Sequence, residues 1–312
     1  MEREGRRQMA AFWNPERVMT AEEAVLLIKN QFSNLTILKV AAFARGFDNT
    51  AFLINERYVF RFPRREIAGE LIKVENRLLP NIAPSLPLEI PKPQYIGKPQ
   101  PNFPWAFSGY ELLGGKNPEK LTREQRKKST NILAQFLRQL HSFPLQQAEK
   151  LQIPYDQLGR LDVKKRKPLL MERINSLKME NRLSDVLYNS LRQFITTVED
   201  TLVDEKKVLV HGDLHLRNML VDDEGKITAV LDWGDTHIGS PAIDLSVAYS
   251  YLPSDCREIF FQMYGDVSEE SKDLARFKAI YSYVLLLLYG YDQGDIQLVN
   301  DCYFSLKLAL EQ

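Results

Sequence analysis

The part of the chain that most constrains its fold is a polar stretch, residues 211–218, with an apolar run on either side. A turn and a further apolar run, residues 227–231, follow it. Short apolar runs bounded by turn residues are typical of buried strands. We therefore expect two neighbouring strands whose loops present Asp213, Asn218 and Asp232 at one edge.

These residue types suit the transfer of a phosphoryl group. That reaction needs a carboxylate that orients the attacking hydroxyl, together with an amide and a second carboxylate on Mg²⁺. Mg²⁺ prefers oxygen ligands and takes few of them from the protein. Asp and Asn also occur as ordinary turn residues, and one of them alone would be interpreted in that way. Three of them in order, with flanking strands, favour a catalytic site.

At these residues the chain resembles the aminoglycoside phosphotransferase family, which is related in fold to the protein kinases. The family's catalytic loop reads H-G-D-x-H-x-x-N, and the matching stretch here is His211–Asn218. The family's metal loop reads [IL]-D-[WF], and Leu231–Trp233 matches it. Gly239–Leu245 is similar to a third family segment, G-x-P-x-x-D-L.

The resemblance implies an α+β, bilobal protein-kinase-like fold. An N-terminal lobe built on an antiparallel sheet, residues 1–112, would bind nucleotide and end in the hinge. A mainly helical C-terminal lobe, residues 113–312, would carry the catalytic loop, the metal loop and the acceptor site. The pattern of the chain agrees with this division, because strand-like runs dominate its first part and helical periodicity its second part.

The resemblance also assigns roles to the polar residues. Asp213 would accept the proton of the substrate hydroxyl or orient that hydroxyl, and Asn218 and Asp232 would hold Mg²⁺. His211 and His215 are expected mainly to brace the loop, with contact to phosphate as an alternative for His215. By analogy with the protein kinases, Asp244 would tie the backbone of the catalytic loop from below. The short stretch after Asp232 has no evident activation segment, which favours a small-molecule kinase over a protein kinase.

Three residues near the start of the chain are candidates for binding the phosphates of a nucleotide. Gly46 would let the backbone approach the phosphates, and Asn49 and Thr50 could donate hydrogen bonds to them. An ordinary hairpin turn would give the same local pattern. The prediction therefore depends on the later motifs.

Arg61 stands at the strand position where protein kinases place a phosphate-binding lysine. An arginine can bind phosphate with two hydrogen bonds. Arg64 and Arg65 are the alternatives for this role. Glu75 on the following helix is the expected partner, with Glu70 as its alternative.

Tyr110, Glu111 and Leu112 resemble the hinge that binds the nucleotide base with backbone groups. ATP and GTP differ in the donor and acceptor pattern that they present to a hinge. The sequence does not show how the backbone is turned, so both donors stay open.

The acceptor is the least constrained part of the prediction. A polycationic aminoglycoside is the leading candidate and would need a carboxylate cluster, whereas a macrolide would need an apolar wall. The presence of Asn218, where macrolide kinases tend to have histidine, favours the aminoglycoside. Metabolite kinases acting on homoserine or choline share the fold, and a catalytically inactive binding module is the remaining alternative. The candidate carboxylates are Asp235, Asp255, Glu258, Asp266, Glu269 and Glu270, and the candidate aromatic residues are Tyr249, Tyr251, Phe260, Phe261, Tyr281 and Tyr283.

Composition limits the other partners. The 312 residues include 41 basic and 41 acidic side chains, and the resulting zero net charge argues against a nucleic-acid partner. The two cysteines, Cys256 and Cys302, indicate neither a disulfide framework nor a zinc site. The first residues lack the apolar core of a signal peptide, and residues 284–288, the most apolar run, are too few to span a bilayer. We expect a cytoplasmic monomer or weak dimer without a membrane partner.

Local patterns give the expected elements. Thr20 with Glu23 is a capping box that begins a helix extending to about Phe32. The other expected elements are strands at 35–44, 50–54, 58–62 and 106–113 and helices at 66–79, 124–141, 181–203, 245–251, 257–264, 271–289 and 296–310.

Overall fold

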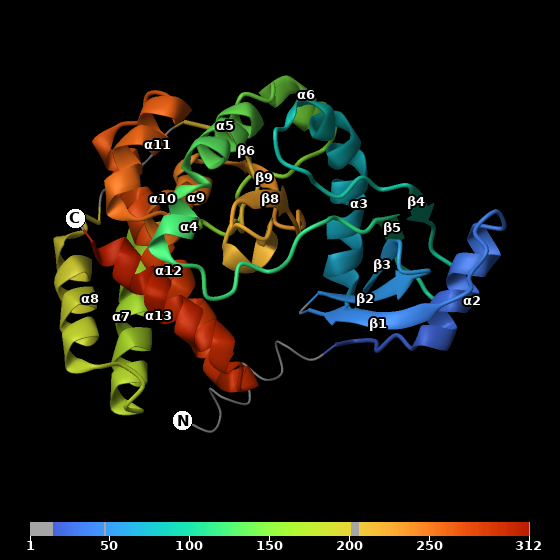
Figure 1. Cartoon of the computed structure of the whole chain (residues 1–312), viewed down its shortest axis with the longest axis horizontal. Helices are drawn as coiled ribbons and strands as arrows, with labels where there is room; N and C mark the ends of the chain where they lie inside the picture. The colour runs from blue at the N-terminus through green and yellow to red at the C-terminus, as the bar shows by residue number, and fades with distance from the viewer. Residues whose placement is uncertain (1–14, 47, 201–205, 312) are drawn as a thin grey trace. The chain divides into compact units, whose positions relative to one another are not determined.

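The computed structural model describes residues 15–46, 48–200 and 206–311. The chain divides into two compact units (Figure 1). Unit 1 contains the residues up to Pro84 together with Ile90–Leu113, and unit 2 contains Ser85–Glu89 together with the residues from Gly114 onward. The expectation about a signal peptide concerns the first residues of the chain and lies outside the described residues.

Unit 1 is built on an antiparallel sheet of five strands in the order β1-β2-β3-β5-β4. Helix α2 begins with the expected capping box, because the Thr20 hydroxyl accepts from the N–H of Glu23 and the Glu23 carboxylate accepts from the N–H of Thr20. The elements are α2 (Ala21–Gln31), β1 (Val40–Arg45), β2 (Asn49–Ile54), β3 (Tyr58–Pro63), α3 (Glu66–Ile82), β4 (Tyr95–Gly97) and β5 (Phe107–Glu111).

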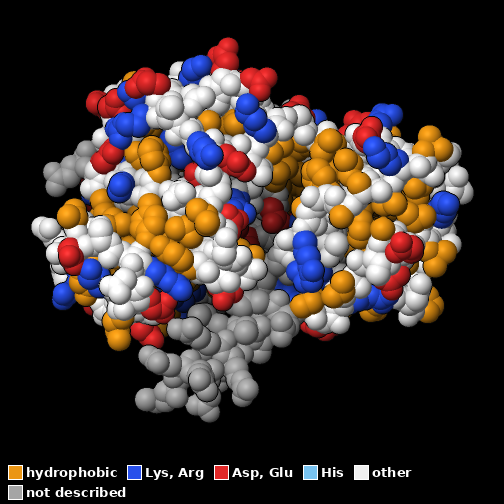
Figure 2. Space-filling view, turned by 60° about the horizontal axis from the view of Figure 1, so that its bottom comes forward, with side chains coloured by type: hydrophobic (Ala, Val, Ile, Leu, Met, Phe, Trp, Pro, Cys, Tyr) orange, Lys and Arg blue, Asp and Glu red, His pale blue; other side chains and the backbone are white. Residues whose placement is uncertain are grey.

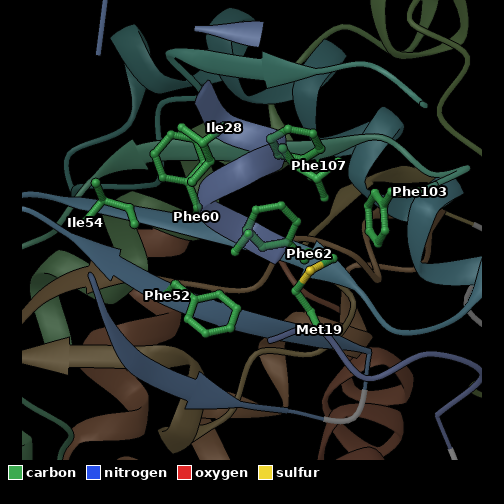
Figure 3. Packing of buried hydrophobic residues seen from close by; sticks show 10 residues of the cluster. Met19, Ile28, Phe52, Ile54, Phe60, Phe62, Phe103 and Phe107 are labelled. Carbon is green, nitrogen blue, oxygen red and sulfur yellow. The ribbon is translucent and has the colours of Figure 1, made fainter. Parts of the chain in front are cut away.

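Alternation along β3 separates the core of unit 1 from its candidate functional face. Phe60 and Phe62 are fully buried among other aromatic residues, and the rings of Phe62 and Phe107 stack with centroids 4.8 Å apart (Figure 3). Successive side chains of a strand point to opposite faces. Arg61 therefore lies on the other face of the sheet, in register with Ala51 of β2 and Ser108 of β5.

Unit 2 is mainly helical, and its longest helix, α12, packs against α7, α9, α10 and α13. Two short antiparallel pairs of strands, β6 with β9 and β7 with β8, accompany the helices. The helices are α4 (Arg123–Lys127), α5 (Thr130–His141), α6 (Leu145–Lys150), α7 (Val163–Met179), α8 (Asp185–Thr197), α9 (Ala242–Leu245), α10 (Val247–Ser250), α11 (Arg257–Tyr264), α12 (Glu269–Gln293) and α13 (Ile296–Leu310). The strands are β6 (Val208–Val210), β7 (Met219–Val221), β8 (Ile227–Val230) and β9 (His237–Gly239).

This architecture confirms the predicted α+β fold, with a sheet-based N-terminal lobe and a mostly helical C-terminal region. Several local expectations were wrong. The helix expected over residues 181–203 spans Asp185–Thr197, and the helix expected over residues 245–251 is replaced by α9 and α10, which are separated at Ser246. The first strand begins only at Val40, and the helix expected over residues 124–141 is interrupted at Lys128 and Ser129. At the interruption, the N–H groups of Lys128 and Ser129 donate to carbonyls three residues earlier, and the Ser129 hydroxyl accepts a hydrogen bond of 3.0 Å from the N–H of Ile227. A contact so distant in sequence leaves no trace in a helical periodicity.

The described residues contain no helix that is long and apolar enough to cross a membrane. Both cysteines, Cys256 and Cys302, are buried and free. On the face shown in Figure 2, the basic and acidic side chains are interspersed and form no single basic patch.

The contact between β5 and β3 leads to a stability prediction. A Cβ atom added at Gly109 would lie 2.6 Å from the Phe60 ring, which is itself fully buried. We expect Gly109→Ala to lower the free energy of unfolding by about 1–3 kcal/mol, measured by urea denaturation. Gly114→Ala is the control, because an added Cβ there meets no atom within 4 Å. Equal effects of the two substitutions would contradict the prediction.

Candidate active site

The loop between β6 and β7 carries most of the predicted catalytic residues, and Gly212 gives it its sharp bend. Gly212 has a φ of +89°, a backbone conformation that residues with a side chain rarely adopt. A Cβ at this position would lie 2.2 Å from the carbonyl oxygen of Asp235. The glycine therefore permits both the turn and the close approach of the chain that follows the metal loop.

Asp244 in α9 holds this loop from within unit 2. Its Oδ2 accepts from the backbone N–H of His211 at 2.7 Å, and its Oδ1 accepts from the N–H of Gly212 at 2.9 Å. His141 of α5 lies 3.1 Å from Oδ2 through Nε2, and its Nδ1 lies 2.8 Å from the Tyr264 hydroxyl. Burial alone would raise the pKa of Asp244, but the His141 hydrogen bond and the other partners lower it. Asp244 is therefore an ionised carboxylate in the core.

His211 links the catalytic loop to the metal loop. Its Nδ1 accepts from the N–H of Asp213 at 3.3 Å, so the proton is assigned to Nε2, which donates to the Leu231 carbonyl at 2.9 Å. The ring meets the buried Trp233 edge-on, with centroids 4.8 Å apart. Both ring nitrogens are therefore used in holding the backbone.

Asp213 combines fixed orientation with accessibility. Its Oδ2 lies 3.2 Å from His215 Nε2 and accepts from Asn218 Nδ2 at 3.1 Å, while 41% of the side chain stays exposed. Burial alone would raise the pKa of Asp213, but the charges of His215 and Lys278 outweigh that effect and lower it. Asp213 is therefore an ionised hydrogen-bond acceptor that an incoming molecule can reach.

Asn218 and Asp232 lie at the same end of the β7–β8 hairpin. Met219, the neighbour of Asn218, pairs with Val230. The N–H of Leu231, the neighbour of Asp232, donates to the Asn218 carbonyl at 2.8 Å. The Asn218 Nδ2 donates to the backbone carbonyl of Asp213 at 2.8 Å, so the side-chain oxygen Oδ1 is turned away from the loop.

The residues at this hairpin fit a divalent cation. Asp232 has a φ of +57°, an uncommon conformation for a residue other than glycine and one that often marks a functional site. The described residues contain no cluster of three or more His, Cys, Asp or Glu side chains suited to a metal. One amide and one carboxylate nevertheless match Mg²⁺, which retains waters and takes further oxygens from phosphate.

In unit 1, Arg61 and Glu75 form a buried ion pair. Arg61 Nη1 donates to Glu75 Oε2 at 2.6 Å, and the two side chains are only 9% and 4% exposed. The pair connects β3 to α3. Removing one partner from such a pair is costly, because an uncompensated charge is left inside the protein.

The alternative residues for these two positions have other partners. Arg64 donates to the Gly46 carbonyl and Arg65 binds Asp48, so both hold the β1–β2 connection. Glu70 pairs with Lys73 on the exposed side of α3 at 2.6 Å. The structure thus pairs Arg61 with Glu75, and the role of Arg61 toward phosphate stays a prediction.

The predicted phosphate-binding residues flank the connection between β1 and β2. The N–H of Gly46 donates to the Asn49 carbonyl at 3.0 Å, and Thr50 pairs with Arg45 across the two strands. The hydrogen bond from Arg64 to Gly46 fixes the start of this turn. These contacts define a hairpin, and its role toward phosphate stays a prediction.

The predicted hinge residues end strand β5. Tyr110 is buried opposite Val59, and Glu111 binds Arg57 at 2.6 Å. The N–H of Leu112 donates to the Arg57 carbonyl at 2.7 Å. That N–H is therefore used within unit 1, and the base-binding role of the three residues stays a prediction.

Comparisons with known proteins agree with this geometry. A family model described as the phosphotransferase enzyme family, APH, matches residues 39–280. The chain belongs to this family. A curated relative, the uncharacterised protein YcbJ of Bacillus subtilis, is 44% identical over only 36 residues, which are 12% of each chain.

Solved structures of APH phosphotransferases share the fold. A complex of APH(2″)-IIIa with GDP and kanamycin has a TM-score of 0.65 and 24% identity, covering 92% of this chain and 97% of that one. A complex of APH(2″)-IIa with streptomycin and ATP has a TM-score of 0.58 and 21% identity, covering 94% and 99%. The macrolide 2′-phosphotransferase MphH of Brachybacterium faecium has a TM-score of 0.58 and 22% identity, covering 90% and 97%.

Two features of this APH-family site were not predicted from the sequence. His141 completes the support of Asp244, and Lys278 lies near Asp213 although it is far away in sequence. The histidine ends an amphipathic helix, where a polar residue gives no distinctive signal. Lys278 lies in α12 among apolar neighbours, and from the sequence alone such a lysine is interpreted as an ordinary exposed residue.

The support of the catalytic loop leads to a prediction about stability. Asp244→Asn keeps the size of the side chain but removes a charge that three partners share. We expect the free energy of unfolding at pH 7 to fall by roughly 3 kcal/mol. Asp223→Asn is the control, because the Asp223 side chain is fully exposed and should contribute almost nothing.

The same variant tests the pH dependence. The folded-state pKa of Asp244 lies below its unfolded value of about 3.9. The carboxylate therefore contributes stability above about pH 4 and loses that contribution as the pH falls further. The wild-type protein should lose more stability below pH 4 than Asp244→Asn, measured by denaturation at several pH values. Parallel acid limbs would show that Asp244 does not carry this contribution.

Proposed function

We propose that the chain is a Mg²⁺-dependent O-phosphotransferase that moves the γ-phosphoryl group of ATP or GTP to a hydroxyl of a small molecule. The observation that carries the proposal is Asp213, an ionised and accessible carboxylate whose orientation is fixed by His215 and Asn218. Membership in the APH phosphotransferase family supports the same reaction class.

In the proposed reaction, the hydroxyl of the acceptor donates a hydrogen bond to Asp213. The hydroxyl oxygen forms a bond to the γ-phosphorus while the bond from phosphorus to the bridging oxygen breaks. The nucleoside diphosphate leaves with the electron pair, and the proton of the hydroxyl passes to Asp213 as the new bond forms. Phosphoryl transfer requires mainly positioning and charge stabilisation, which a fixed carboxylate supplies.

The Asn218 side-chain oxygen and the Asp232 carboxylate would hold Mg²⁺. The ion would supply positive charge that offsets the negative charge developing on the phosphoryl group. The hydrogen bonds from Asn218 Nδ2 to Asp213 would orient the Asn218 Oδ1 atom as a metal ligand. Asp213 and the metal ligands would then act as one connected unit.

Residues of unit 1 would bind the nucleotide. Arg61, positioned by Glu75, would bind phosphate oxygens, and the β1–β2 connection at Gly46, Asn49 and Thr50 would cover them. Tyr110, Glu111 and Leu112 would bind the base through their backbone. Both GDP and ATP occur among the solved APH complexes, so we propose testing ATP and GTP separately.

The acceptor predicted from the sequence is an aminoglycoside. The kanamycin and streptomycin complexes of related folds support this choice, and the macrolide phosphotransferase of the same fold supports the alternative. Transfer from each nucleotide to kanamycin, a macrolide, homoserine and choline is the experiment that tests the acceptor class.

Substitution of Asp213 tests the reaction itself. We expect Asp213→Asn to lower kcat about 10²- to 10⁴-fold, because the hydroxyl loses its charged acceptor. The measurement is formation of nucleoside diphosphate with the best acceptor found. Nucleotide should still raise the melting temperature of the variant, since a ligand of the folded state stabilises it. Turnover close to that of the wild-type protein would contradict the proposal, and Asp223→Asn serves as the control.

Substitution of Asp232 tests the metal site. Asn at this position tolerates the positive φ of the backbone but is a weaker ligand for a hard cation. We expect Asp232→Asn to raise the Mg²⁺ concentration needed for half-maximal activity by roughly 10- to 100-fold. Titration of activity with Mg²⁺ at saturating nucleotide measures this value. An unchanged Mg²⁺ requirement would remove Asp232 from the metal site.

A further inference from the structure

Lys278 is an unexpected cation in the wall next to the catalytic carboxylate. A small pocket in unit 2 is lined by Asp213 and His215 of the catalytic loop, by Ile243 and Ser246, and by Lys278 and Ala279 of α12. The presence of Lys278 among these residues places a positive charge where the acceptor of the proposed function should lie.

The ammonium group of Lys278 has spare hydrogen-bonding capacity. Its Nζ donates to the Ser282 hydroxyl one turn later on α12, at 2.5 Å. Across the described ranges, no acidic side chain forms an ion pair with Lys278. A lysine carries three N–H donors, so two remain for a ligand. Lys278 is only partly buried, which leaves those donors accessible from the pocket.

Charges of both signs surround Lys278, namely the carboxylates of Asp213, Asp235 and Asp244 and the guanidinium of Arg160. Burial lowers the pKa of Lys278, while the nearby carboxylate of Asp213 opposes that effect. Arg160 is a second nearby cation, and its charge also disfavours the ammonium. Asp213 itself is reserved for the reacting hydroxyl in the proposed function. Asp235 binds Arg160, and Asp244 binds the backbone of the catalytic loop. The ammonium of Lys278 is therefore left to bind an anionic group of a ligand.

The carboxylates that a polycationic acceptor would require are not gathered here. None of the six candidates from the sequence lines this pocket. Asp235, which lies near Lys278, already binds Arg160 at 2.5 Å, and Asp255 binds Lys127 at 2.7 Å. A polycation at Asp213 would also meet the positive charge of Lys278.

We propose that Lys278 binds an anionic group of the acceptor, a carboxylate or a phosphate ester close to the hydroxyl that is phosphorylated. This inference rests on the reaction of the proposed function, and it selects small hydroxy acids or sugar phosphates as acceptors in place of the aminoglycoside expected from the sequence. A charge-assisted hydrogen bond from Lys278 would fix the hydroxyl over Asp213.

The first experiment measures binding by calorimetry, with Mg²⁺ and a non-hydrolysable nucleotide present. The anionic probes are D-glycerate and sn-glycerol 3-phosphate, the matched neutral probe is glycerol, and the cationic probes are choline and kanamycin. We expect at least one anionic probe to bind more tightly than glycerol and both cations. Failure of both anionic probes to bind, while nucleotide still binds, would overturn the inference. Failure of nucleotide to bind would contradict the proposed function instead.

The second experiment replaces the ammonium. We expect Lys278→Met to weaken binding of the anionic probe about 10- to 100-fold and to leave glycerol binding unchanged. Lys278→Arg should retain part of the affinity, because it keeps the charge. Lys272→Met is the matched control on the same helix, since Lys272 binds Glu269 and lies outside the pocket. Because Lys278 forms no ion pair within the described parts of the chain, its replacement by methionine should not prevent folding.

The phosphoryl group of the donor is a second possible source of the same anionic chemistry. If Lys278 binds that group, Lys278→Met should weaken binding of the nucleotide with Mg²⁺ in the absence of any acceptor. Such a loss, with unchanged affinity for the anionic probe, would overturn the assignment to the acceptor. Loss of probe affinity with retained nucleotide affinity would support it.

Discussion

The hydrogen bonds that Asp244 accepts from the backbone of the catalytic loop are the interaction on which the candidate site depends. Inside a protein an unpaired N–H group is costly, and an unpaired carboxylate is more so. Here the carboxylate and the N–H groups satisfy one another, because Asp244 accepts hydrogen bonds from the N–H groups of His211 and Gly212. Asp244 also contacts His141. These hydrogen bonds fix the backbone of the two residues that precede Asp213, and they use no atom that the proposed chemistry needs.

The two antiparallel strand pairs of unit 2 carry this order from the loop to the candidate metal ligands. Pairing of β6 with β9 sets the distance between the catalytic loop and the segment after the metal loop, so that only glycine fits at position 212. Pairing of β7 with β8 places Asn218 and Asp232 at one end of a single ladder. His211 then joins the two strand pairs through its hydrogen bond to the Leu231 carbonyl. Three residues that are up to 19 positions apart are thereby positioned by backbone pairing.

The sequence predicted what depends on local patterns and failed where distant contacts decide. The capping box at Thr20 and the helices ending at Tyr264 and Leu310 follow from periodicity and caps, and the structure has them at the expected positions. At the interruption, Ser129 accepts a hydrogen bond from Ile227, a contact that no local pattern encodes. The position of Lys278 near Asp213 was not predicted for the same reason, because the two residues come together only when α12 packs on α9.

The low pKa of Asp213 bears on how a site of this kind would work. A carboxylate held by His215, Asn218 and the charge of Lys278 is a weak base before the reaction. A strong base is not required if the bond to the leaving group breaks early, because the hydroxyl then loses its proton late. Under that condition a fixed acceptor of a hydrogen bond is more useful than a basic one, since it orients the oxygen without competing for the proton. Lys278, whose charge helps to lower this pKa, would then also serve to bind the anionic group of the acceptor.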